Sequence, residues 1–80
     1  MDRRTLSQLN PGESGCIYAI NTTHKALRRR LIDMGMVPYT DIKVKRIAPM
    51  GDPIEISMRG FSLSIRREDA EKIVIMHDDE

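Results

Sequence analysis

The side chains that could do chemistry are few and far apart in this 80-residue sequence. Its single cysteine, Cys16, and the histidine His24 would act as nucleophile and base only if the fold brought them together with a third, orienting group. Nothing in their spacing requires this, and one cysteine cannot supply the paired thiolates of a structural zinc site. The sequence also lacks the G-x-x-x-x-G-K-[ST] pattern of a phosphate-binding loop. We therefore expect no enzyme activity, no catalytic residue and no cofactor.

The C-terminal run HDDE, His77 to Glu80, is the one dense group of candidate metal ligands. Its carboxylates suit hard divalent cations, but it shows no ligand spacing such as H-x3-H. We interpret residues 77–80 as a flexible acidic tail and predict no metal site.

Three consecutive arginines, Arg28, Arg29 and Arg30, form the most prominent charge cluster. On a helix they would spread over about 200° of surface, because successive residues lie about 100° apart, so they cannot form one phosphate-binding pad. Arg29 is placed to pair with Asp33 one turn later. Two interpretations stay open: the arginines are a solvated helix face, or Arg28 or Arg30 contacts an acidic patch on a partner.

Composition narrows the class of protein. The 13 lysines and arginines are balanced by 12 acidic residues, and there are only three aromatic residues, which disfavours a nucleic-acid-binding domain. No apolar run approaches the roughly 20 residues that cross a bilayer, and the start of the chain does not resemble a signal peptide. We expect a cytoplasmic protein with no membrane insertion of its own.

Apolar spacing predicts one amphipathic helix over about residues 24–34. Leu27, Leu31 and Met34 recur at i, i+4 and i+7 and should form its core side. The run NTT at 21–23 offers the N-cap.

The end of this helix is marked by three residues. Gly35 stands where a left-handed C-terminal cap belongs, with Met36 placed to fold back onto the last turn, as in a Schellman motif. Pro38 prevents the helix from continuing.

The rest of the chain is typical of short strands. These are expected near residues 16–20, 41–48, 54–59, 60–65 and 73–76, with short helical turns near 6–9 and 67–71. Ile47 falls out of phase with the alternation before it, which predicts a β-bulge near Arg46. Gly60, next to Arg59, marks a tight hairpin, and Phe61 is expected to face the core together with the other apolar residues of its strand, Leu63 and Ile65.

These elements predict a mainly β protein: a small SH3-like barrel of five to six strands with one amphipathic helix. We expect a single domain over residues 1–76.

Three segments carry a resemblance to a known family. LSQLNPGESG, LRRRLIDMGMVPYT and APMGDPIEISMRGFSLSIRREDAEKI, in this order and spacing, resemble the ferrous iron transport protein A (FeoA) family over nearly the whole chain. The resemblance implies a small cytoplasmic regulator of ferrous iron uptake that acts with the membrane permease FeoB, which carries a GTP-binding domain. In this family a glycine usually follows the proline after the helix, whereas here Tyr39 follows Pro38. We therefore expect a type I turn, which tolerates tyrosine.

The helix end is the candidate partner surface. Ile32 points about 100° away from the centre of the core side, and with Met36 and Val37 it could form an exposed apolar strip bordered by positive charge. The alternative is that Ile32 packs beneath the N-terminal segment around Leu6 and Leu9. An arginine finger from the helix into the GTP site of FeoB is least favoured, since fingers usually stand on loops.

Other functions stay open as alternatives. A nucleic-acid-binding barrel could use the basic residues Lys43, Lys45, Arg46, Arg66 and Arg67. An SH3-like regulatory module linked to iron-dependent transcriptional control is a second alternative, and a direct Fe(II) sensor is the weakest because the chain shows no ligand cluster. Weak self-association is also left open.

Overall fold

The computed structural model describes residues 2–77. These residues form six strands, two α-helices and one 3-10 turn: β1 (Asp2–Thr5), η1 (Leu6–Gln8), β2 (Ser14–Ile20), α1 (Lys25–Asp33), β3 (Asp41–Ile47), β4 (Ile54–Met58), β5 (Phe61–Ile65), α2 (Arg67–Ala70) and β6 (Ile73–His77).

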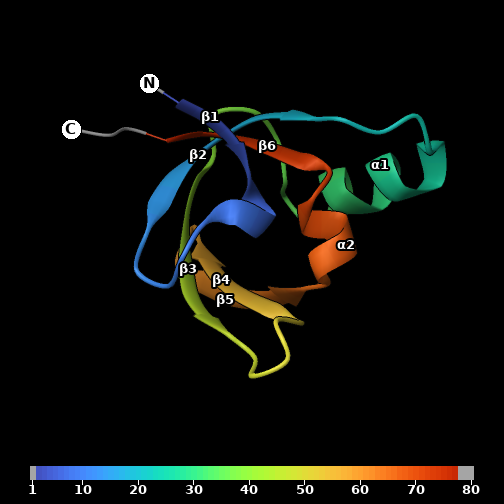
Figure 1. Cartoon of the computed structure of the whole chain (residues 1–80). Coiled ribbons are helices and arrows are strands. Elements are labelled where there is room, and N and C mark those ends of the chain that lie inside the picture. The colour runs from blue at the N-terminus through green and yellow to red at the C-terminus, as the bar shows by residue number, and fades with distance from the viewer. Residues whose placement is uncertain (1, 78–80) are drawn as a thin grey trace.

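The six strands form one antiparallel sheet in the order β1-β6-β2-β3-β4-β5. The sheet curls around the core, α1 stands to one side of it, and α2 lies beside α1 (Figure 1). The predicted fold class, a mainly β SH3-like barrel with one amphipathic helix, is confirmed.

The N-terminal strand β1 was not expected from the sequence. Its residues, DRRT, show no apolar alternation, so no pattern reveals it. It forms because its backbone pairs with β6, from Asp2 opposite His77 to Thr5 opposite Val74. The predicted tail therefore starts too early, since His77 is the last residue of β6, and residues 78–80 lie outside the described part of the chain.

Helix α1 is capped at its N-terminus by His24 rather than by the NTT run. Nδ1 of His24 accepts the Leu27 N–H at 3.1 Å. The Thr22 hydroxyl instead accepts the His24 N–H at 3.1 Å. Thr22 therefore positions the capping residue, and the His24 imidazole caps the helix.

The C-terminal end of α1 is the predicted Schellman motif. Gly35 has a φ of 98°, its N–H donates to the Ile32 carbonyl at 2.9 Å, and the Met36 N–H donates to the Leu31 carbonyl at 3.0 Å. Leu31 is fully buried, and Leu27 and Met34 pack partly buried against the core.

The turn after the helix differs from the prediction. Tyr39 has a φ of 70°, and the Thr40 N–H donates to the Val37 carbonyl at 3.3 Å, so Pro38 and Tyr39 occupy the centre of a type II turn rather than a type I turn. The cause is long-range: the Tyr39 N–H donates to the carbonyl of Ile17 at 2.7 Å, and the Ile17 N–H donates to the Thr40 carbonyl at 2.9 Å. Pairing with β2 thus holds a tyrosine in a backbone conformation that favours glycine.

The strand irregularities follow the sequence. The β3–β4 register shifts between Val44 and Arg46, which confirms the predicted bulge. Arg59 and Gly60 have φ values of 52° and 85°, the pattern of a type I′ hairpin turn between β4 and β5. Phe61 was expected in the core but is 47% exposed, because it lies at the turn end of the outermost strand.

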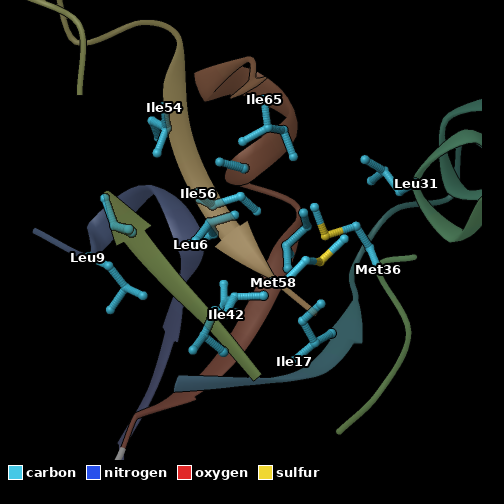
Figure 2. Packing of buried hydrophobic residues seen from close by; sticks show 14 of the residues in the cluster. Leu6, Leu9, Ile17, Leu31, Met36, Ile42, Ile54, Ile56, Met58 and Ile65 are labelled. Carbon is cyan, nitrogen blue, oxygen red and sulfur yellow. The ribbon is translucent and has the colours of Figure 1, made fainter. Parts of the chain in front are cut away.

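The core is aliphatic and includes buried residues of every strand except β1. Leu31 from α1 and Met36 from the segment after it reach into the same cluster as Met58 of β4 (Figure 2). Leu6 of η1 and Leu9 just after it are buried in the same core cluster. The helix end is therefore fixed to the barrel by its own buried residues.

Candidate docking surface

We call three residues of the last turn of α1 and the segment that follows it the helix-end surface: Ile32, Val37 and Tyr39. Ile32 is 41% exposed and Tyr39 is 80% exposed, while Val37 is half-buried. Ile32 lies outside the core cluster that holds Leu6 and Leu9. An apolar group at this exposure has the composition of a small protein-binding surface.

Met36 does not belong to this surface. Its side chain is fully buried in the core, so the prediction that it forms part of an exposed strip is wrong. The reason is the Schellman motif itself, in which the residue after the glycine folds back onto the last helical turn.

Tyr39 was not predicted as a candidate site residue, although its position in the sequence could have suggested it. A tyrosine stands where the resembling family usually has glycine, and this exchange places a large aromatic side chain in solvent on a left-handed backbone. Such backbone strain costs about 1 kcal/mol or more and is found preferentially at functional sites.

The three arginines of α1 have three different environments. Nη2 of Arg28 donates to the carbonyls of Ile20 at 2.8 Å and Thr22 at 3.3 Å, so this side chain holds the connection between β2 and α1. Arg29 lies 3.8 Å from Asp33, and both side chains are exposed. As the helical geometry predicts, the arginines do not form one pad.

Arg30 joins the two helices. Its Nη2 lies 3.0 Å from Oδ2 of Asp69 in α2, and the two residues line a cleft of about 300 Å³ whose other lining residues are His24, Ala26, Leu27 and Glu68. This contact could not be predicted from local sequence patterns, because 39 residues separate the partners.

The residues with possible catalytic or metal chemistry stay apart. Cys16 lies half-buried in β2, opposite Met76 of β6, while the His24 ring caps α1. In residues 2–77 no three or more His, Cys, Asp and Glu side chains come close enough to hold a metal ion together.

The basic strand residues of the nucleic-acid alternative are partly engaged by acids. Arg46 Nε lies 2.6 Å from Glu55 Oε1, and Lys45 Nζ lies 3.8 Å from Glu55 Oε2. Lys45 also donates to the Ser62 hydroxyl at 3.0 Å. These pairs reduce the positive charge that the outer face of the sheet presents.

The curled six-stranded sheet with a single longer helix defines the class of this protein as a small SH3-like barrel. Within that class, the family model described as the FeoA domain matches residues 4–77. The chain belongs to the FeoA family.

Similar proteins support this assignment. The chain is 34% identical over 70 residues to the Fe(2+) transport protein A/Fe(2+) transporter FeoB fusion protein of Porphyromonas gingivalis, covering 88% of this chain and 8% of that protein. The solution structure of a FeoA-like protein from Clostridium acetobutylicum has a TM-score of 0.90 at 34% identity, over 100% of this chain and 92% of that one. FeoA of Chlorobium tepidum has a TM-score of 0.80 at 42% identity, over 95% and 73% of the two chains.

More distant structures share only the fold. Stenotrophomonas maltophilia FeoA, described as a prokaryotic SH3 domain protein, is 23% identical with a TM-score of 0.78 over 90% of this chain and 88% of that one. The structure of IdeR from T. acidophilum is 22% identical with a TM-score of 0.85, over 98% of this chain and 35% of that one. Neither helix of residues 2–77 is long and apolar enough to span a bilayer.

Proposed function

We propose that this protein is a cytoplasmic accessory protein of ferrous iron uptake and acts by binding the cytoplasmic part of a FeoB-type permease. The observation that carries the proposal is the fusion protein of P. gingivalis, in which a FeoA sequence 34% identical to this chain shares one polypeptide with FeoB. Two domains joined in one chain are held at high effective concentration, which suits partners that bind each other when separate.

The helix-end surface is our candidate for the contact with FeoB. Ile32 and Tyr39 project large apolar side chains into solvent, and exposed aromatic residues are typical anchors of protein interfaces. Arg29, whose side chain is 83% exposed, borders the surface one turn before Ile32 and is available to an acidic residue of the partner. Arg28 and Arg30 are proposed to hold α1 in place rather than to contact FeoB, since each makes a contact within the protein.

Rigidity favours this surface. The backbone of the helix-end surface is held in place by three kinds of contact: the Schellman hydrogen bonds, the buried Met36 side chain, and the two backbone hydrogen bonds between β2 and the turn at Tyr39. A pre-organised surface loses less conformational entropy when it binds. In this proposal the protein recruits or orients FeoB, and it does no chemistry of its own.

A titration of the cytoplasmic domain of the cognate FeoB tests the proposal. The wild type is compared with Ile32→Glu and Arg29→Ala by isothermal titration calorimetry, with far-UV circular dichroism to establish folding. We expect Ile32→Glu to weaken binding at least tenfold, because it places a carboxylate in an apolar contact, and Arg29→Ala to weaken it by a smaller factor.

Met50→Glu is the matched control. It makes the same kind of exchange at a residue that is 91% exposed on the β3–β4 loop, and it should bind as the wild type does. If the wild type does not bind FeoB, the proposed partner is wrong. If the wild type binds and Ile32→Glu binds equally well, the helix-end surface is wrong while the partner stands.

A further inference from the structure

The outer edge of β5 is unpaired in the described part of the chain. β5 is the last strand of the sheet and pairs only with β4, and none of its backbone groups bonds to another element within residues 2–77. An open strand edge presents a row of N–H and C=O groups that can pair with a further strand.

The register shows which residues present those groups. Met58 and Phe61 flank the two-residue turn and form a hydrogen-bonded pair, so Leu63 and Ile65, at alternate positions, also bond to β4. The backbone N–H and C=O groups of Ser62 and Ser64 therefore point outward, to the open edge. Both serine side chains are exposed.

The two edges of the sheet are protected differently. β1, at the other edge, carries Asp2, Arg3 and Arg4 among its four residues, and such charges discourage pairing with a foreign strand. β5, with the sequence FSLSI, contains no charge and no proline. It therefore lacks the charges and the proline that commonly discourage strand addition.

We propose that two copies of this chain pair through their β5 strands, antiparallel and about a two-fold axis at Leu63. The sequence FSLSI reads almost the same in both directions, with serines on both sides of a central leucine and an apolar residue at each end. A two-fold pairing then places Ser62 opposite Ser64 of the other copy, and each Phe61 opposite an Ile65. The 47% exposed Phe61 would gain cover from the second copy.

Charge on the outer face fits this pairing. Ser62 holds the Lys45 ammonium at 3.0 Å, and Ser64 lies opposite Glu55 in the β4–β5 register. Because Ser62 faces Ser64 across the two-fold axis, Lys45, which reaches Ser62 from β3, and Glu55 of the other copy, which lies opposite its Ser64, are on the same outer face on either side of the serine pair. The two-fold axis repeats this arrangement, so no like charges meet across the serine pairs.

The dimer is expected to be weak. Only five residues pair, and beyond them Arg59 of one copy would come opposite Arg67 of the other, which stops the pairing at the strand ends. The pairing uses backbone groups of β5, whereas the proposed FeoB contact uses side chains of the helix-end surface, so the two are tested by different variants.

Cysteine cross-linking tests the register. In a Cys16→Ser background, Leu63→Cys places two thiols in a non-hydrogen-bonded pair whose Cα atoms lie about 4.5 Å apart, within the range that a disulfide spans. Ser64→Cys is the matched control on the same strand. It is more exposed, but its two copies lie about 9 Å apart in this register, too far for a disulfide.

We expect Leu63→Cys to oxidise to a covalent dimer several times faster than Ser64→Cys. Random collision predicts the reverse order, because the exposed thiol reacts first. Equal or reversed rates would overturn the proposed register.

Sedimentation equilibrium of the protein without engineered cysteines tests the association itself. The apparent mass of the wild type and of Ser64→Ala should rise toward twice the monomer mass as the concentration approaches the millimolar range. Ser64→Pro removes only an outward N–H and should remain a folded monomer. A wild type that is monomeric throughout this range overturns the proposal. If the wild type is monomeric and Ser64→Pro no longer binds FeoB, the open edge of β5 is a binding site for the permease and not for a second copy.

Discussion

The guanidinium of Arg30 lies 3.0 Å from the carboxylate of Asp69 and joins α1 to α2. The Asp69 side chain is 13% exposed and that of Arg30 is 61% exposed, so the pair sits at the border between core and solvent. α2 itself starts at a contact from another loop, since the Arg67 N–H donates to Oδ1 of Asp52 at 3.0 Å. The two helices are thus positioned by polar contacts that link distant parts of the sequence.

Asp69→Ala should lower the free energy of unfolding by about 1 kcal/mol. The loss is small because the Arg30 side chain that loses its partner is largely exposed and stays hydrated. A double-mutant cycle with Arg30→Ala, measured by urea denaturation, should give a coupling energy of about 0.5 kcal/mol. The pair of Arg29 and Asp33, with side chains 83% and 68% exposed, is the comparison and should give less. A larger coupling for Arg29 and Asp33 would contradict this ranking.

Local chemistry made most of the fold predictable. Gly35 and the apolar spacing of α1 specify a helix and its end, and the alternation of β4 and β5 specifies a hairpin, because these signals act within a few residues. β1 and the turn at Tyr39 could not be predicted in the same way. Both are fixed by backbone pairing with strands far away in the sequence, β6 in one case and β2 in the other.

Gly15 in β2 meets a neighbouring strand so closely that no side chain fits. A Cβ at this position would lie 2.6 Å from Cγ2 of Ile75 and 2.7 Å from the carbonyl oxygen of Met76. Since a backbone atom cannot move aside as a side chain can, Gly15→Ala should lower the free energy of unfolding by about 3 kcal/mol.

Gly12→Ala is the control for Gly15→Ala. Gly12 has a φ of 91° and open space around it, so alanine there costs about 1 kcal/mol through the backbone alone. Thermal or urea denaturation that ranked Gly12→Ala above Gly15→Ala would argue against the close approach of β2 and β6.

The candidate site could be predicted only in part, as Ile32 and Met36 illustrate. The helical angle turns Ile32 away from the core side but leaves two positions open for it, and the structure shows it exposed. The Schellman pattern correctly folds Met36 back onto the last turn, and this burial rules out its expected place in an exposed strip. Met36→Ala should lower the free energy of unfolding by about 3 kcal/mol, because it leaves a cavity in the core. Ile32→Ala should lower it by less than about 1 kcal/mol, and similar losses for the two variants in urea denaturation would contradict the burial difference.

Tyr39 provides a test that separates stability from binding. Tyr39→Gly and Tyr39→Ala both remove the 80% exposed side chain, but only glycine adopts a φ of 70° without strain. The glycine variant should therefore be more stable than the alanine variant by about 1 kcal/mol in urea denaturation.

If Tyr39 is an anchor for FeoB, the two variants should lose affinity by the same factor despite their different stabilities. Binding that followed stability, with the glycine variant retaining wild-type affinity and the alanine variant losing it, would mean that the turn conformation matters and the aromatic ring does not. Wild-type affinity in both variants would remove Tyr39 from the surface and leave Ile32 and Val37 as its apolar contacts. A common loss of affinity would instead explain why a strained tyrosine stands where glycine would be more stable, since the strain is then offset on binding.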